Sequence, residues 1–103
     1  EAQWQAQVTQ LAALYGWSWM HVRRSIGKGS RWTTATNVIG WPDLLLWHET
    51  ARRVVAAELK TDAGKATAEQ LDVLRSLQLA GIEVHVWRPS DLATVAAILK
   101  GQQ

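Results

Sequence analysis

The chain has 103 residues, of which 48% are hydrophobic and 19% are charged, with a net charge of +2 and no cysteine. This length and composition predict a single folded domain over 1–103 and exclude a disordered chain. The absence of cysteine excludes disulfides and thiolate metal sites, so any bound metal would have oxygen or histidine ligands.

No apolar run approaches the length that spans a membrane, and the amino end lacks the charged-then-apolar pattern of a signal peptide. We therefore expect a cytoplasmic protein with no membrane partner. The Gly-Lys-Gly sequence at 27–29 lacks the spacing and context of a phosphate-binding P-loop. No organic cofactor is expected.

The first third of the chain predicts a helix, a strand and a long irregular segment. Apolar residues at helical spacing predict an amphipathic helix over 1–15 that ends at Gly16; they are Trp4, Val8, Leu11, Leu14 and Tyr15. Alternation of apolar and polar residues predicts a strand over 17–22. The segment 23–39 is expected to be irregular, and a loop of this length in a small domain is usually functional or partly disordered.

Two short apolar runs, 44–47 and 54–57, predict neighbouring strands joined by a turn. Thr67 and Gln70 then form a capping-box pattern at the start of a second helix, which ends at Gly81. Its buried face is expected to consist of Leu71, Leu74 and Leu77.

Alternating residues predict a strand over 82–87, and Pro89, Ser90 and Asp91 introduce a last helix that ends before Gly101. The order is α-β-β-β-α-β-α. Hairpin strands combined with one helix-linked parallel strand predict an α/β fold with a mixed β-sheet flanked by helices.

The ends of the two central strands carry acidic residues. Asp43 opens the first strand directly after Pro42, a position that proline tolerates. Glu58 and Lys60 share one face of the second strand because side chains alternate, while Leu59 points the other way. If the hairpin pairs in register, Asp43 lies near Glu58.

Converging carboxylates repel unless they are protonated or bridged by a cation, so the pattern points to Mg²⁺ or Mn²⁺. These ions keep several waters and leave room for a phosphate, and Lys60 could orient or help to deprotonate a water and stabilise charge on phosphorus. The constellation would be a phosphodiesterase. The same three residues could equally form an ion-paired strand end, because short motifs often occur by chance.

The segment 21–40 carries four basic residues and no acid: Arg23, Arg24, Lys28 and Arg31. Such a stretch favours phosphate backbones, although basic loops are also common on surfaces without a partner. We assign these residues, together with Lys65 in the turn after the second central strand, to nucleic-acid binding.

Several polar residues have two possible roles. Glu1 could point from the first helix toward the sheet or be a solvated helix-end acid. Gln70 could serve only as the capping partner of Thr67 or also reach the metal site. The three histidines, His21, His48 and His85, do not pair at metal-ligand spacing, and His21 is the one that borders the acidic strand end.

The segments GWPDLLLW, AELKTDAGKATAEQ and LAGIEVHVWRPSDL resemble the VRR-NUC domain, a branch of the PD-(D/E)xK nuclease superfamily. The resemblance covers nearly the whole chain and implies a restriction-endonuclease-like fold. It also implies that Asp43, Glu58 and the helix acid Glu1 bind a divalent metal, and that Lys60 and Gln70 complete the catalytic set.

The resemblance further implies a metal-dependent endonuclease that hydrolyses DNA, similar to stand-alone phage members that are dimeric and structure-specific, some of them acting on branched or four-way junctions. We therefore expect the protein to form a homodimer. We also expect it to act in a bacterial cell or in a host cell infected by a phage. The alternatives are a non-cleaving or weakly active DNA-binding module on the same fold, and an α/β protein whose strand-end charges are structural.

Overall fold

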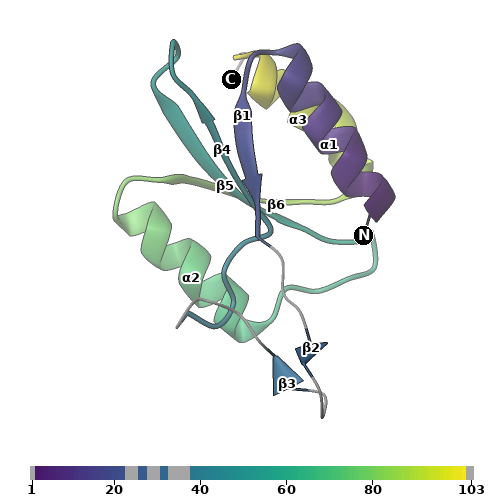
Figure 1. Ribbon diagram of the computed structural model, residues 1–103, viewed down its shortest axis with the longest axis vertical. Coiled ribbons are helices and arrows are strands. Elements are labelled where there is room, and N and C mark those ends of the chain that lie inside the picture. The colour runs from purple at the N-terminus through teal and green to yellow at the C-terminus, as the bar shows by residue number, and fades with distance from the viewer. Residues whose placement is uncertain (1, 23–25, 28–30, 33–37, 102–103) are drawn as a thin grey trace.

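A mixed four-stranded sheet lies between helices on both of its faces (Figure 1). The computed structural model describes residues 2–22, 26–27, 31–32 and 38–101. In chain order the elements are α1 (Ala2–Leu14), β1 (Ser18–His21), β2 (Ile26–Gly27), β3 (Arg31–Trp32), β4 (Leu44–His48), β5 (Arg53–Leu59), α2 (Ala68–Leu79), β6 (Glu83–Trp87), the 3₁₀ turn η1 (Pro89–Asp91) and α3 (Leu92–Lys100). The predicted order around one mixed sheet is confirmed.

The main sheet has the strand order β1-β4-β5-β6. β4 pairs antiparallel with both β1 and β5, whereas β5 and β6 are parallel and are linked through α2. β2 and β3 form a separate antiparallel pair inside the segment that was expected to be irregular, which corrects that expectation. Two-residue strands carry too little periodicity to be recognised in a sequence.

The hydrophobic core fills the space between the sheet and the layer of α1 and α3. Because side chains alternate, one face of β4 and of β5 contributes to it, together with Trp87 at the end of β6. Its buried members are Trp4, Val8, Ala12, Trp17, Leu44, Leu46, Val55, Ala57, Leu59, Trp87, Val95 and Leu99. The opposite face of β5 presents Ala56 and Glu58 on the side of α2.

Two tryptophans anchor this core through their indole N–H groups. Trp4 Nε1 donates to Trp87 O at 3.1 Å, and Trp17 Nε1 donates to Leu99 O at 2.7 Å. The first bond holds the beginning of α1 at the end of β6. The buried donors thereby keep the hydrogen bonds that they would otherwise lose on leaving water.

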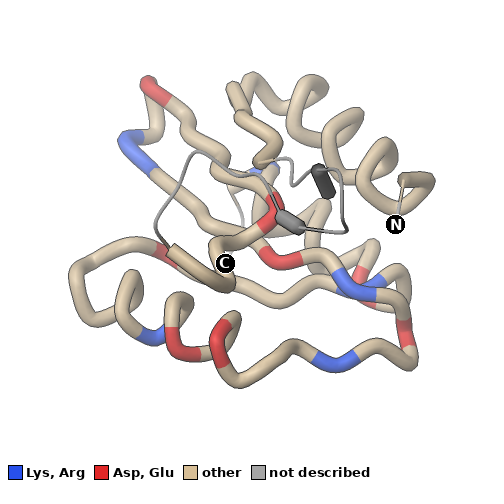
Figure 2. The backbone as a smooth tube through the Cα atoms, turned by 60° about the horizontal axis from the view of Figure 1, so that its bottom comes forward, with Lys and Arg blue, Asp and Glu red and all other residues tan. Residues whose placement is uncertain are grey.

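Figure 2 shows that α1 carries no Lys, Arg, Asp or Glu, whereas α2 carries both signs of charge. One ionic cluster lies against α3, where Arg53 Nη1 donates to Ile98 O at 2.9 Å. The Arg53 guanidinium contacts both Glu83 oxygens at 2.8 Å and lies 5.1 Å from the ring centre of Trp17. His85 approaches Glu83 at 2.9 Å and stacks on Trp87. Burial raises the pKa of Glu83, but hydrogen bonds from His85 and Arg53 outweigh it and leave the pKa lowered.

The helices differ in detail from the apolar patterns of the sequence. Leu14 is 70% exposed and Leu71 is 51% exposed, so both expectations of burial were wrong. The buried residues of α2 are Gln70 and Leu74, because α2 turns its capping residue toward the sheet. Within the described ranges, no helix has the length and apolar character that crossing a membrane requires.

The chain enters β4 by passing close to the start of α2. Gly40 is buried with φ of +92°, and a Cβ added there would lie 2.6 Å from the backbone carbon of Glu69 and 2.8 Å from the nitrogen of Gln70. Glycine therefore allows two backbones to touch at this point. The contact fixes the segment before Asp43 against the helix turn that carries Gln70.

We expect Gly40→Ala to destabilise the protein more than Gly81→Ala. Gly81 has a similar φ of +104° but no atom within 4 Å of an added Cβ, so its substitution measures backbone strain alone, about 1–2 kcal/mol. Gly40→Ala adds a clash with α2 that costs about 1–3 kcal/mol more. Denaturant unfolding of the two variants measures the difference, and equal losses would contradict the close contact.

Candidate active site

The register of the sheet brings two predicted acids together. Leu44 pairs with Ala57 in the antiparallel ladder of β4 and β5, so Asp43 comes opposite Glu58. Asp43 Oδ2 accepts a hydrogen bond from the backbone nitrogen of Leu59 at 2.8 Å. On its other side, Asp43 O accepts from the nitrogen of Val22 at 2.9 Å. Asp43 is thus held between β1 and β5, as the pairing in register required.

Glu58 is a buried acid with an uneven set of partners. Its side chain is 2% exposed. Oε2 receives a hydrogen bond from Gln70 Nε2 at 2.9 Å and lies 3.2 Å from Lys60 Nζ. Oε1 is buried and has no hydrogen-bond partner among the described residues. Buried polar atoms normally have a partner, so a bare carboxylate oxygen here indicates a place for a cation or a proton.

Burial raises the pKa of Glu58 from its ordinary value of 4.5 to about 7. Repulsion from the Asp43 carboxylate acts in the same direction, while the hydrogen bond and charge of Lys60 oppose it. Without a cation, one proton near neutral pH relieves the repulsion between the two acids.

Gln70 fills both of the roles considered from the sequence. Its Oε1 accepts from the Thr67 nitrogen at 2.9 Å and its own nitrogen donates to Thr67 Oγ1 at 3.1 Å, which is a complete capping box. Its Nε2 remains free for Glu58. One amide therefore starts α2 and holds the buried acid.

The donor set suits a hard divalent ion. Asp43 and Glu58 supply carboxylate oxygens, which Mg²⁺ and Mn²⁺ prefer, and Glu58 Oε1 is available. The described residues contain no group of three or more His, Cys, Asp or Glu that could hold a metal ion. Glu1, the third expected ligand, lies outside the described residues.

The beginning of α1 nevertheless reaches this end of the sheet. Trp87 O accepts from Trp4 Nε1 and from the nitrogen of Lys60, so the first turn of α1 and the residue after β5 meet at one carbonyl. In Figure 1 the amino end of α1 lies beside the chain that follows β5.

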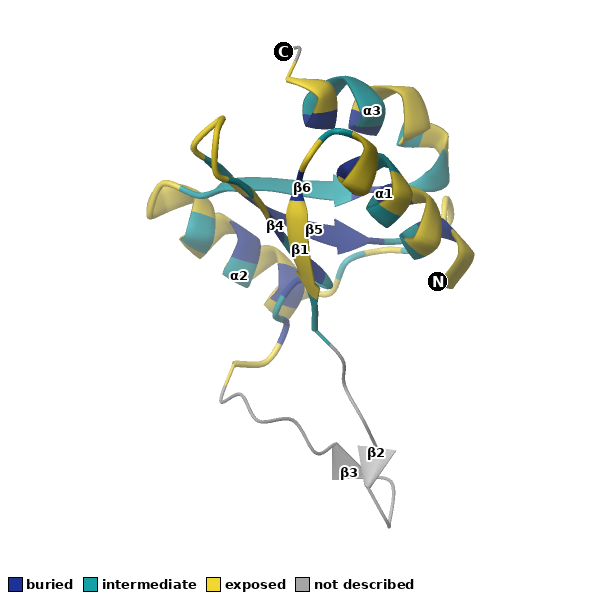
Figure 3. Ribbon diagram, turned by 45° about the horizontal axis from the view of Figure 1, so that its top comes forward, coloured by how far each residue is buried: buried dark blue, intermediate teal, exposed yellow. Residues whose placement is uncertain are grey.

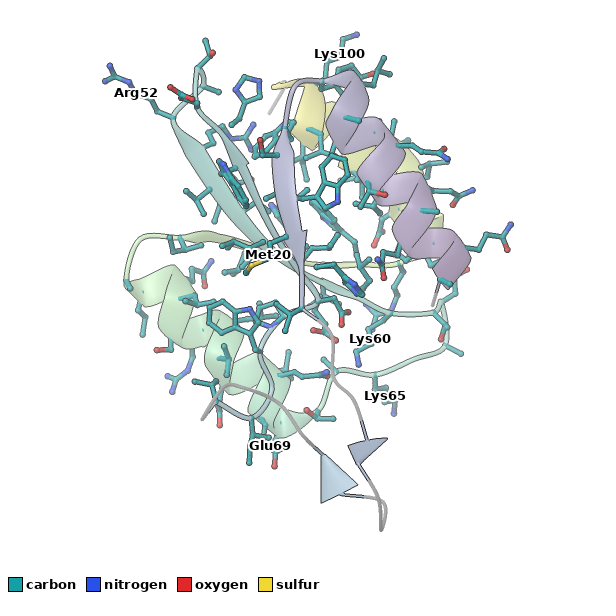
Figure 4. The ribbon with its side chains drawn as sticks, in the orientation of Figure 1. Met20, Arg52, Lys60, Lys65, Glu69 and Lys100 are labelled. Atoms are coloured by element: carbon teal, nitrogen blue, oxygen red, sulfur yellow. The ribbon has the colours of Figure 1, made fainter. Side chains whose placement is uncertain are left out.

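The loop after β5 is fixed by long-range hydrogen bonds that were not predicted from the sequence. Arg88 Nη2 donates to Gly64 O at 2.8 Å, and the nitrogen of Ser90 donates to Asp62 Oδ1 at 3.0 Å. Both bonds tie the loop of Lys60 and Lys65 to the connection between β6 and α3 (Figure 4). The turn-forming residues RPSD at 88–91 can be recognised in the sequence. Their hydrogen-bond partners, Gly64 and Asp62, become neighbours only in the folded chain.

Of the predicted DNA-binding residues, Lys65 is exposed in this loop and Arg31 belongs to β3. Arg23, Arg24 and Lys28 lie outside the described residues. The DNA-binding role of these basic residues therefore stays a prediction.

The histidines occupy different surroundings. His48 Nε2 lies 3.1 Å from Tyr15 O, and its Nδ1 accepts from the nitrogen of Ala51, so this ring joins α1 to the hairpin turn. His21 pairs with Leu44, next to Asp43, and its Nδ1 is buried without a hydrogen-bond partner in the described chain.

In metal-free buffer we expect the free energy of unfolding to fall as pH rises. An acid whose pKa is higher in the folded state stabilises the fold below its unfolded pKa of 4.5 and loses that contribution as pH passes about 7. The loss has a ceiling of about 3 kcal/mol. Glu58→Gln should flatten this slope, whereas the exposed Glu69→Gln should keep it. Parallel pH profiles for the wild type and Glu58→Gln would contradict the raised pKa.

Comparison with known proteins agrees with the geometry. The model of the VRR-NUC domain family matches residues 4–91, a range that includes Asp43, Glu58, Lys60 and Gln70. A search of curated proteins found no match to the chain. The family match covers most of the 103 residues, and the chain therefore belongs to the VRR-NUC domain family, a family of nuclease domains.

Proposed function

We propose that this nuclease domain is a divalent-metal-dependent endonuclease that hydrolyses DNA phosphodiester bonds, with Mg²⁺ or Mn²⁺ at Asp43 and Glu58. It acts as a homodimer of the phage type in the cytoplasm of a bacterium or an infected host cell. Its preferred substrates are branched DNA and four-way junctions, in keeping with the family resemblance.

The observation that carries the metal site is the state of Glu58. A carboxylate with 2% exposure has one oxygen satisfied by Gln70 and Lys60, and the other without a partner in the described chain. Asp43 stands opposite it in the register. A purely structural ion pair would leave neither a bare buried oxygen nor a second acid beside it, because both features cost free energy.

In this proposal each residue has a distinct task. Asp43 and Glu58 would hold the ion, and a divalent ion in that place would supply polarisation of the phosphate and a lowered pKa for a water. Lys60 lies beside Glu58 and can direct its ammonium to the attacking water or to the oxygens on phosphorus. The water oxygen would bond to phosphorus and release a proton to solvent, the bond from phosphorus to the leaving oxygen would break, and that oxygen would take up a proton from solvent. Gln70 fixes the orientation of Glu58.

The proposed DNA path follows the basic residues near this site. Lys65 follows Lys60 in the loop and is exposed to solvent. We also assign DNA binding to Arg31 of β3 and to Arg23, Arg24 and Lys28, which lie outside the described residues; such basic side chains would contact the phosphate backbone without regard to base sequence.

The cleavage assay uses plasmid and labelled four-way junction, flap and single-stranded DNA in Mg²⁺, Mn²⁺ or EDTA. We expect metal-dependent cutting that is fastest on branched substrates. Asp43→Asn and Lys60→Met should each lower the rate by at least roughly 10²-fold, because both remove groups that act on the reacting phosphate.

Matched controls are Asp72→Asn on the exposed side of α2 and Lys100→Met at the end of α3, which remove the same charges elsewhere. Both should cut at the wild-type rate. Binding of DNA without cleavage in any metal would favour the non-cleaving module, and the absence of both would indicate that the charges at the strand end are structural.

Light scattering tests the homodimer. Trp47 and Val54 pair across β4 and β5 and are 39% exposed each, so they supply apolar surface on one face of the sheet for a second copy. We expect twice the mass of one chain at micromolar concentration, with and without DNA. The mass of a single chain under both conditions would refute the dimer.

A further inference from the structure

An apolar hollow of about 290 Å³ opens beside the candidate active site. Its lining residues are Met20, Val22, Val38 and Trp41. Met20 is 49% exposed and Val38 is 37% exposed, so large apolar groups are left in contact with solvent. The hollow includes residues from the end of β1 and from the segment that leads into β4.

The register of the sheet places this hollow next to the acids. Met20 pairs with Leu45, and the next pair on the same face brings Val22 opposite Asp43, where Val22 N donates to Asp43 O. Glu58 continues this row on β5. Val22, Asp43 and Glu58 therefore lie on three adjacent strands, and Trp41 precedes Asp43 by two residues.

On the face of β1 that lies on the same side of the sheet as α2, Met20 keeps about half of its surface exposed. α2 packs mainly against β6, at the opposite edge of the sheet from β1, and reaches β5 through the bond from Gln70 to Glu58. In Figure 3, β1 is coloured as exposed along most of its length, whereas β5 is buried. In Figure 4, Met20 lies toward the end of the sheet at which Lys60 is found.

We propose that this hollow receives one unpaired nucleobase of the DNA strand whose backbone lies across Asp43 and Glu58; the inference rests on the proposed function. An indole, a thioether and two valine side chains offer a flat aromatic group and apolar walls, which suit the face of a base. The volume is at the small end of ligand sites and matches a single ring system better than a larger group.

The side chains that line the hollow determine which part of a nucleobase it can recognise. Met20, Val22 and Val38 have side chains that do not read the hydrogen-bonding edge of a base, whereas stacking on an aromatic ring accepts every base. A base reaches such a site only when it is unstacked, and unpairing is easiest at junctions, flaps and single strands. The hollow would therefore select the structure of the DNA around the cut and not its sequence.

The test is a double-mutant cycle between the protein and the DNA. A junction is prepared with an abasic nucleotide at each position around the cleaved phosphate in turn, and affinity is measured in EDTA while cleavage is measured in Mg²⁺. For the wild-type protein, removing the base at one position next to the cut should weaken binding by about 5- to 100-fold.

Trp41→Ala should bind the intact junction more weakly by the same factor and should no longer respond to the abasic position. Trp41→Phe, which keeps an aromatic ring, should restore the response. Leu79→Ala removes an apolar side chain that is 79% exposed at the end of α2 and does not line the hollow, and it should behave like the wild type. Met20→Ala provides a second lining variant at a half-exposed position, should Trp41→Ala fail to fold.

The outcomes separate this inference from the proposed function. Cleavage in Mg²⁺ with no sensitivity to any abasic position, or with equal sensitivity in the wild type, Trp41→Ala and Met20→Ala, overturns the base site and leaves the nuclease. Loss of the dimer in Met20→Ala by light scattering would assign the hollow to a second copy instead. No cleavage of any substrate refutes the proposed function itself.

Discussion

A carboxylate that is removed from water must be neutralised or paired, and at Glu58 this requirement organises the surrounding structure. Glu58 and Gln70 are the buried polar residues of the described chain. Gln70 comes from α2, Lys60 from the end of β5, and Asp43 from the start of β4, and each acts on the charge of this single group. Three elements of the fold therefore meet at one acid.

Much of this arrangement follows from local rules. Alternation along β5 places Glu58 and Lys60 on one face, and the salt bridge confirms it. The short turn of the hairpin fixes the register, so Asp43 arrives opposite Glu58. The capping box at Thr67 is equally local, because its residues lie within one helical turn. Short-range geometry explains why these features were predictable.

Features that depend on packing between distant segments were not predictable. Leu71 was expected to be buried beside Leu74, but the rotation of α2 exposes Leu71 and buries Gln70 next to Leu74, whose burial was predicted correctly. The bond from Arg88 to Gly64 and the hollow at Trp41 require elements to be assembled before any partner is defined. A single sequence contains no periodicity that reports such contacts.

The double use of Gln70 couples secondary structure to chemistry. Helix ends open more readily than a whole fold unfolds, and here the first turn of α2 contains the donor to Glu58. Opening the first turn of α2 would release the amide and leave Glu58 with a weaker hold on its position, while the core of α1, α3 and the sheet stayed intact. Loss of activity on heating should therefore precede global melting, so the thermal limit of the enzyme is set by one helical turn.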